Sequence, residues 1–363
     1  MLHTWTEGHD EFISDSYAGI INHLNGEIEQ LGGVIKLGEE VTAIEVVDGT
    51  SPPFASLCSG IDHLASPDLH VKITSQSTSL SPNGLCQIQD WQGHCTLVTL
   101  PLGVLKHNPP KFTPELPLRR REAISSLGFG LLNKIVLKYD RAWWSSVKGQ
   151  ALSIAHASSF VFLPDFDKNP LRLQGPKGGK LEQIYRGAFP GRSQEERENN
   201  PLAVAIMDLN TLSNIPALEF MIGGDTADAL EECTDEQVAA WAHAVVADYL
   251  GPFTAATGAD GKATTLTAVK DKVPEPTKVH VTRWRSDRFA FGSYAYSPAL
   301  RDGEQESTPL DFLELSRTLW GRVFWAGEHT EVDSYASAHG AWLSGDREGR
   351  KILRNLAGWT NSL

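Results

Sequence analysis

The 363-residue sequence has few cysteines, no excess of positive charge and no long apolar run. Its four cysteines form no Cys-x-x-Cys pair, and their spacings match no zinc site. So few cysteines in so long a chain are typical of a reducing compartment. The net charge of −13 argues against a basic surface for nucleic acid. No apolar stretch reaches the roughly 18 residues that a membrane-spanning helix needs.

The first ten residues lack a basic segment followed by an apolar run, so we expect no signal peptide. The sequence therefore predicts an intracellular protein, cytoplasmic or nuclear, that does not enter a membrane. Its composition, 41% apolar and 21% charged, is that of a globular protein. The length suggests about two domains of roughly 150 residues each. The acidic balance suits a cationic substrate, although it is also common in ordinary soluble proteins.

Apolar spacing predicts three long helices and one short one. The first covers residues 17–31, and the short one covers residues 118–127. The clearest covers residues 234–250, where Thr234 and Gln237 form a capping box and the apolar residues form a buried stripe. The last begins near Ser337 and ends before Gly358. Its predicted packing face consists of Ala338, Ala341, Trp342, Gly345, Gly349, Ile352, Leu353 and Leu356.

Short apolar runs between turn residues predict strands at residues 34–37, 41–47, 71–74, 95–100, 133–139, 218–222, 278–283 and 322–326. Residues 165–200 are rich in glycine, proline and charge, which predicts an exposed insertion. Helices and strands thus alternate, and the sequence predicts an α/β or mixed α+β fold.

Several sequence blocks together resemble one family, the flavin-containing amine oxidases. They are TLPLGVLK at residues 99–106, LGFGLLNKIVL at 127–137, VTRWRSD at 281–287 with GSYAY at 292–296, and FWAGEHT at 324–330 with HGAWLSG at 339–345. Each block alone is weak evidence, but all of them in the family's order are specific. The resemblance is to the polyamine oxidase and lysine-specific histone demethylase type.

The resemblance implies two domains that interleave along the chain. Residues 1–130 and 303–363 would belong to a partial, Rossmann-like FAD-binding domain. Residues 131–302 would form a substrate-binding domain with a mixed sheet, against which the helix at 234–250 packs.

The resemblance also implies an FAD site. Glu328 would accept hydrogen bonds from the ribityl chain, the sugar-like part of the flavin. The helix that begins at Ser337 and Ala338 would direct its positive end at the flavin ring. The remaining cofactor contacts would come from Val41, Leu100, Pro101 and Trp284.

Lys134 and Tyr294 are the residues to which the resemblance assigns roles in catalysis. Lys134 would fix a water at flavin N5, although a lysine in mid-strand is usually a solvent-facing residue. Tyr294 and Tyr296 alternate on a strand, so both rings face one side. They would attract an amine cation through their faces, with Phe289 and Tyr335 nearby; from the pattern alone, two core tyrosines are the simpler interpretation.

The implied reaction is FAD-dependent oxidation of a C–N bond by hydride transfer, with O2 reduced to H2O2. The substrate would be a small cationic polyamine, or alternatively a methyl-lysine peptide. The family's Gly-x-Gly-x-x-Gly turn, which binds the FAD pyrophosphate, is missing from the sequence. We therefore expect a fragment of a longer reading frame; the alternative is a non-catalytic remnant or binding protein. If the oxidase interpretation holds, Lys134, Tyr294, Glu328 and the helix after Ser337 must converge.

Overall fold

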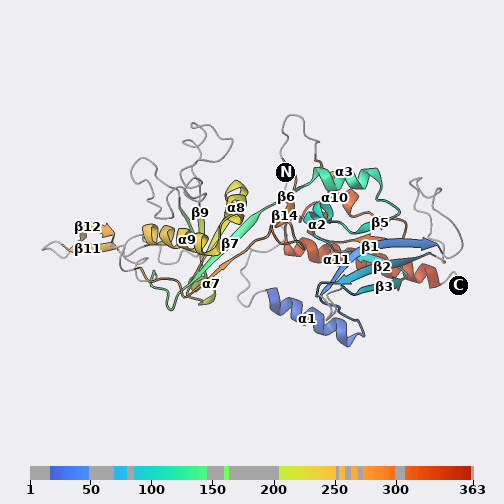
Figure 1. The fold of residues 1–363 in the computed structure, drawn as a ribbon, viewed down its shortest axis with the longest axis horizontal. Helices are drawn as coiled ribbons and strands as arrows, with labels where there is room; N and C mark the ends of the chain where they lie inside the picture. Colours follow the sequence, from blue (N-terminus) through green and yellow to red (C-terminus); the bar gives the residue numbers. More distant parts are fainter. Residues whose placement is uncertain are drawn as a thin grey trace. The chain divides into compact units, whose positions relative to one another are not determined.

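The structure is a computed structural model that describes residues 17–48, 69–79, 86–144, 159–162, 204–250, 253–257, 263–268, 273–298 and 307–360. Helices occur together with parallel and antiparallel strands (Figure 1), which confirms the predicted mixed α/β fold class. The predicted insertion at residues 165–200 lies outside the described residues.

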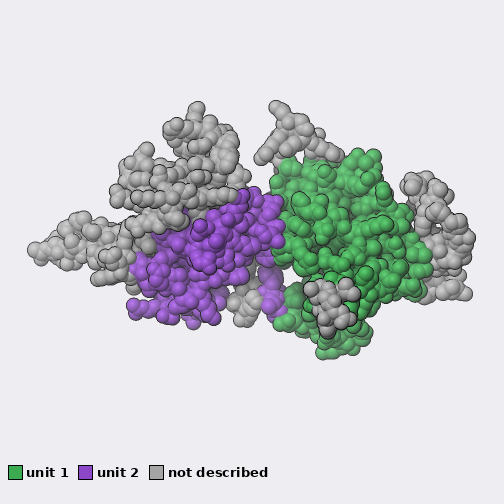
Figure 2. Space-filling view, viewed as in Figure 1, with its two compact units in different colours: residues 1–9, 21–130, 287–363 green, residues 10–20, 131–286 purple. Residues whose placement is uncertain are grey.

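The chain divides into two compact units (Figure 2). Unit 1 comprises residues 1–9, 21–130 and 287–363, and unit 2 comprises residues 10–20 and 131–286. The long segment of unit 2 thus begins between Gly130 and Leu131 and ends between Ser286 and Asp287. The assignment of residues 1–130 and 303–363 to an FAD-binding domain, and of 131–302 to a substrate domain, stays a prediction.

Unit 1 contains a four-stranded sheet of order β3-β2-β1-β5 and two strand pairs, β14 with β6 and β15 with β4. Its strands are β1 (Glu39–Asp48), β2 (Leu69–Ser77), β3 (Ile88–Gly93), β4 (Thr96–Val98), β5 (Lys111–Thr113), β6 (Gly128–Gly130), β14 (Tyr294–Tyr296) and β15 (Val323–Trp325). Its helices are α2 (Leu102–His107), α3 (Leu118–Ser126), α10 (Pro309–Leu315), the 3-10 turn η2 (Glu328–Thr330) and α11 (Ala338–Thr360). Helix α1 (Tyr17–Gln30) has residues in both units.

Unit 2 contains a five-stranded sheet of order β13-β7-β10-β9-β8 and the separate pair β11 with β12. Its strands are β7 (Leu132–Lys138), β8 (Ser159–Phe162), β9 (Val204–Asp208), β10 (Ala217–Gly223), β11 (Phe253–Thr257), β12 (Ala263–Ala268) and β13 (Lys278–Val281). Its helices are α7 (Leu209–Ser213), α8 (Gly224–Glu231) and α9 (Asp235–Leu250).

Strand β7 shows why unit 2 folds as the sequence predicts. Its residues alternate between a buried face with Asn133, Ile135 and Leu137, and a more exposed face with Lys134 and Lys138. Successive side chains of a strand point to opposite faces, so this alternation is expected when one face packs against a core. Helix α9 covers that core and packs against β7 and β13. The predicted capping box is present, because the Thr234 and Gln237 backbone amides each donate to the other residue's side chain, at 3.0 and 3.3 Å.

One local prediction for unit 1 is wrong, and two elements are longer than predicted. Residues 34–37 are not a strand, because nothing among the described residues pairs with them, and Val34 and Leu37 are exposed. The strand predicted at 71–74 is the centre of the longer β2, which pairs with β3 in antiparallel register despite many polar residues. Helix α11 continues to Thr360 instead of ending before Gly358.

Two helices expose apolar residues that the sequence pattern predicts to be buried. Helix α1 has no buried residue, and its Tyr17, Ile20 and Ile21 are exposed. On α11, Trp342 and Leu353 are also exposed. The periodicity therefore identifies both helices correctly but does not identify the covered face.

Candidate functional site

The carboxyl ends of two parallel strands lie side by side in unit 1. Strand β15 pairs in parallel with β4, with Trp325 opposite Val98, and the Ala326 amide donates to the Val98 carbonyl at 3.0 Å. After β4 the chain continues through Leu100 and Pro101 into α2. After β15 it continues into the η2 turn with Glu328. The carboxyl edge of parallel strands is a common ligand site, and three predicted cofactor residues lie at this edge.

Gly327 makes the turn before Glu328 possible. Its φ is 139°, a conformation that favours glycine. A Cβ atom at this position would lie 2.5 Å from the His329 ring. The His329 side chain itself is buried beneath the turn. A side chain at residue 327 would therefore require both a strained backbone and a displaced imidazole.

The Glu328 carboxylate joins two other segments of unit 1. The Ala295 amide in β14 donates to one carboxylate oxygen at 3.1 Å. The Ala336 amide, two residues before α11, donates to the other oxygen at 2.7 Å. A hydrogen bond to a charged acceptor is stronger than one between neutral groups. Glu328 thus fixes the strand that carries Tyr294 and the start of α11 relative to the η2 turn.

The ionisation of Glu328 reflects two opposing effects. Burial raises the pKa of Glu328 above its usual value, while the hydrogen bonds from the Ala336 and Ala295 amides act in the opposite direction. A carboxylate offers about four lone-pair positions. Two are used by the backbone amides, so Glu328 retains acceptor capacity for a hydroxyl group of a ligand.

The two tyrosines of β14 lie on its exposed side. Tyr294 and Tyr296 are 36% and 42% exposed, and Ala295 between them is fully buried. The strand pairs with β6, which places Gly130 opposite Tyr294 and Gly128 opposite Tyr296. The simpler interpretation of two core tyrosines is therefore wrong, and both rings are open to a ligand.

Ser337 determines where α11 begins. Its hydroxyl accepts a hydrogen bond from the Gly340 amide at 3.1 Å, which is a typical N-cap contact, and donates to the Ser334 carbonyl at 2.6 Å. A Cβ atom at Gly340 would lie 1.9 Å from the Ser334 carbonyl oxygen, so only glycine fits there. Ala338 is the first residue of the helix. It lies two residues after Ala336, whose amide donates to Glu328.

The remaining predicted residues of unit 1 have more ordinary contacts. Val41 lies at an irregularity in the pairing of β1 with β2. The Phe289 ring is half exposed, and the Arg288 guanidinium lies 4.7 Å from its centre. The Tyr335 ring packs against Phe312 at 4.9 Å. These contacts neither require nor exclude a ligand, and the assigned roles stay predictions.

Lys134 and Trp284 belong to unit 2. The Lys134 ammonium lies 3.1 Å from a carboxylate oxygen of Glu219 on β10, and the lysine side chain is 43% exposed. The Trp284 amide donates to the Asn133 side chain at 3.2 Å. The structure thus joins Glu328 to the backbone beside Tyr294 and to the start of α11. The convergence of Lys134 with these residues stays a prediction.

Asn133 is a polar residue that the sequence analysis did not single out. It is fully buried, accepts from the Thr282 hydroxyl at 3.1 Å and donates to Glu231 at 2.8 Å. Burial alone would raise the pKa of Glu231, but hydrogen bonds from Ser286, Asn133 and the Arg285 amide lower it overall. This network fixes the backbone around Trp284. An asparagine on the inward face of a strand was the available signal.

Comparison with known proteins agrees with this arrangement. The family model described as flavin containing amine oxidoreductase matches residues 6–353. Lysine-specific histone demethylase 1 homolog 2 of Arabidopsis thaliana is 32% identical over 265 residues, which are 73% of this chain and 27% of that protein. Lysine-specific histone demethylase 1 homolog 1 of Oryza sativa subsp. japonica is 29% identical over 266 residues, 73% and 24% of the two chains.

A fungal relative, histone demethylase-like protein A of Aspergillus fumigatus, is 26% identical over 260 residues, 72% of this chain and 19% of its own. The matched region is therefore about a quarter of the length of these relatives or less. Among the described residues, no helix is both long and apolar enough to cross a membrane. The family match extends over nearly the whole chain and includes the η2 turn, β14 and α11, and its flavin implies FAD as the cofactor. The chain belongs to the family of flavin-containing amine oxidoreductases.

Proposed function

We propose that this chain contributes to an FAD-dependent amine oxidase that oxidises a C–N bond of a cationic amine. One observation supports the proposal most directly. The Glu328 carboxylate, at the carboxyl edge of two parallel strands, joins the strand of Tyr294 to the start of α11. A hydroxyl acceptor, an exposed aromatic pair and a helix N-terminus are thereby part of one connected arrangement.

The residues present fit part of an FAD molecule. Glu328 would accept a hydroxyl group of the sugar-like chain, since its oxygens retain lone pairs beside the two amides. The first turn of α11, capped by Ser337, would face the ring with its positive end. Leu100 and Pro101, at the same strand edge, would contact the flavin. When bound, FAD would supply the acceptor for a hydride from the amine.

The substrate end of the site would depend on aromatic side chains. Tyr294 and Tyr296 expose their rings on one side of β14, and such rings attract cations. Phe289 would add a third ring and Tyr335 a fourth. Trp284, whose amide is fixed by Asn133, would lie by the cofactor.

The amine that binds is the finer part of the proposal. A polyamine is the first candidate, because a small cation requires only an acidic surface and an aromatic cage. A methylated lysine side chain is the second candidate, and the names of the relatives favour it, since all three are histone demethylases or similar to them.

The test is to incubate the purified chain with FAD, remove free FAD, and record the visible spectrum before and after anaerobic addition of an amine. Retained flavin that is bleached by spermine or N-acetylspermine supports the polyamine substrate. Bleaching only by a dimethyl-lysine peptide supports the second candidate. If the protein is colourless, or if its flavin is not bleached by any of these amines, the proposal fails for this chain.

Lys134 provides a sharper test, because strand β7 offers a matched control. Replacing Lys134 by Met should slow reoxidation of the reduced flavin by O2 by about tenfold or more, since a cation beside the flavin stabilises developing negative charge. Lys138 lies on the same face of β7 and is exposed, so Lys138→Met should leave the rate unchanged. Stopped-flow absorbance measures both rates, and equal rates in the two variants would remove the role assigned to Lys134.

A further inference from the structure

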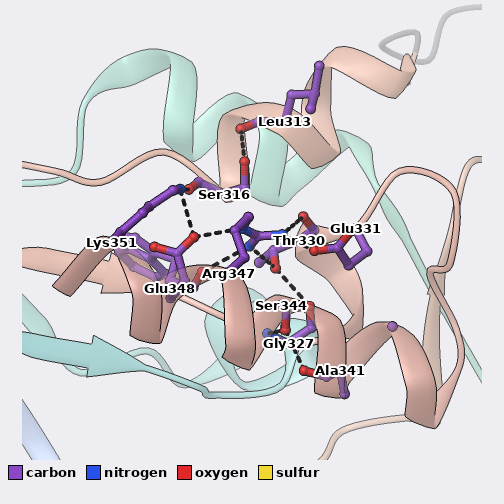
Figure 3. Close-up of polar contacts among 12 residues, drawn as sticks. Leu313, Ser316, Gly327, Thr330, Glu331, Ala341, Ser344, Arg347, Glu348 and Lys351 are labelled. Atoms are coloured by element: carbon purple, nitrogen blue, oxygen red, sulfur yellow. Dashed lines mark hydrogen bonds and ion pairs between the residues drawn. The ribbon is translucent and has the colours of Figure 1, made fainter. Parts of the chain in front are cut away.

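Helix α11 turns a polar face toward the η2 turn. We define the α11 polar face as Ser344, Arg347, Glu348 and Lys351; its contacts are drawn in Figure 3. Ser344 and Glu348 are fully buried, although they lie on a helix whose Trp342 is largely exposed. A buried polar group costs free energy unless it is hydrogen-bonded, so the contacts of this face indicate what it does.

Arg347 donates to five acceptors, four of them on residues 325–331 and the fifth on its neighbour Glu348. Its Nε donates to Glu348 at 2.7 Å, and its terminal nitrogens donate to the Thr330 carbonyl at 3.2 Å and the Thr330 hydroxyl at 2.9 Å. The same nitrogens also contact the Glu331 carboxylate and, at 3.4 Å, the Trp325 carbonyl. A guanidinium has five N–H groups in one plane. Arg347 therefore joins α11 to Trp325, three residues before Glu328, and to Thr330 and Glu331, which follow it.

Ser344 fixes the other end of the same turn. Its hydroxyl accepts from the Gly327 amide at 2.9 Å and donates to the Ala341 carbonyl at 2.6 Å. The Thr330 hydroxyl, which accepts from Arg347, donates to the Gly327 carbonyl at 2.8 Å. Both flanks of Glu328 are thus bonded to α11, directly or through one hydroxyl group (Figure 3).

The network continues beyond the turn through Lys351. Its ammonium donates to Glu348 at 2.7 Å and to the Ser316 carbonyl, after the end of α10, at 3.3 Å. Glu348 thus accepts from both Arg347 and Lys351. The position of the guanidinium is fixed by carboxylates on two sides, since Glu331 contacts its other end.

We propose that Arg347 is a positioning residue for Glu328. It fixes the chain on either side of Glu328, and the Glu328 carboxylate in turn accepts hydrogen bonds from the Ala295 and Ala336 amides. Arg347 thereby determines the placement of β14 and of the start of α11, although its own contacts are to other residues than Glu328 and Tyr294. Only its consequence for FAD binding rests on the proposed function.

Lysine cannot replace Arg347 in this role. An ammonium is a single charged point with three donors, whereas the five acceptors here lie around a planar fork. Arg347→Lys keeps the charge and loses most of the contacts. We therefore expect it to behave like Arg347→Met.

The primary experiment measures amide hydrogen exchange at Ala295 and Ala336 in the chain without FAD. Both amides should exchange about tenfold faster in Arg347→Lys and Arg347→Met, because the carboxylate that accepts them loses its fixed position. Arg350 is the matched control: it is exposed, and its guanidinium pairs with Asp346 at 2.8 Å. Arg350→Met should leave both amides unchanged. Wild-type exchange at both amides in the Arg347 variants overturns the proposal.

A second variant covers the case in which the Arg347 variants do not fold, as judged by circular dichroism. Ser344→Ala removes only the acceptor of the Gly327 amide and keeps the guanidinium. It should speed exchange at Ala336 by about threefold in a folded chain, because one of the bonds that fix the turn is lost. If Ser344→Ala folds and protects Ala336 as in the wild type, the proposal is overturned.

FAD titration separates this inference from the proposed function. If the wild-type chain binds FAD, Arg347→Lys should weaken binding, and adding it to Glu328→Gln should cause no further loss, because both changes act on one carboxylate. Additive losses would overturn the positioning role. If the wild-type chain does not bind FAD, the proposed function fails, and amide exchange still decides the role of Arg347.

Discussion

Helices α9 and α11 are both long, and both carry an apolar stripe at helical spacing, yet they bury opposite faces. On α9 the stripe is buried, with Val238, Ala242 and Val245 fully inaccessible. On α11 the fully buried Ser344 and Glu348 lie on the polar face, and Trp342 on the stripe is 60% exposed. The two helices show that periodicity reveals a helix, whereas the neighbouring segment determines which face is covered.

The segments that pack against the two helices differ in where their backbone hydrogen bonds go. Helix α9 packs against β7 and β13, whose amides and carbonyls bond to adjacent strands. Because these backbone groups are paired within the sheet, the sheet presents only its side chains to α9, and apolar packing is favoured. Helix α11 lies against the η2 turn and the end of β15, where backbone groups of Trp325, Gly327 and Thr330 bond to side chains of α11. Buried backbone groups need partners, and α11 supplies them.

The largest effect should come from Trp241, for which the exposed Trp342 is the matched control. Trp241 on α9 is 3% exposed and lies in the core of unit 2. Trp241→Ala should lower the free energy of unfolding by about 3–5 kcal/mol. Trp342→Ala on α11 should change it by less than about 0.5 kcal/mol, as is usual for an exposed side chain. Urea denaturation measures both, and similar losses would show that the α11 stripe is covered in solution.

A pH effect of intermediate size should come from His329, beneath the turn that α11 supports. Burial, together with the charge of Arg120, lowers the pKa of His329 from 6.5 to about 4. The unfolded chain therefore binds a proton between these values and the folded chain does not. The free energy of unfolding should fall as the pH decreases from 6.5 to about 4, by roughly 3 kcal/mol in total.

His329→Gln removes this titration and is the control. The difference in unfolding free energy between wild type and variant should change over this pH window and be constant above it. Denaturation series at several pH values measure the difference. A difference that does not vary with pH would show that His329 has the same pKa in the folded and unfolded chains.

The smallest effect should come from the α9 capping box. Thr234→Ala removes the hydroxyl that accepts the Gln237 amide and should cost about 1 kcal/mol. The same measurement on Ser337→Ala tests the cap of α11. We expect a larger loss at Ser337, because its hydroxyl also donates to the Ser334 carbonyl. Equal losses would mean that this second bond contributes little.

Unit 2 follows its sequence closely where the signals are local. The alternation of β7 and the capping box of α9 depend on residues only a few positions apart, and both are present. Residues 34–37 have the same local appearance as a strand but find no partner among the described residues. A strand is completed by a distant segment, and a short apolar run does not contain that information.

The candidate site shows the same limit. The motif around Glu328 could be read from the sequence, as could the position of Tyr294 on a strand. The partners of Glu328 could not, because Ala295 and Ala336 use backbone amides that any residue would supply. The pairing of Lys134 with Glu219 also depends on the register of β7 with β10. Long-range register is set by the whole sheet.

Ala336 has a left-handed backbone, with φ at 60°, two residues before the longest helix of the described chain. For a residue with a Cβ atom this conformation costs about 1–2 kcal/mol. The bond from its amide to Glu328 is of the charged kind that contributes about 1.5–3 kcal/mol, which offsets that cost. Without the carboxylate, Ala336 would relax into a right-handed conformation and α11 would lengthen at its amino end. The start of this helix is therefore set by the Ser337 cap together with a carboxylate eight positions before Ala336.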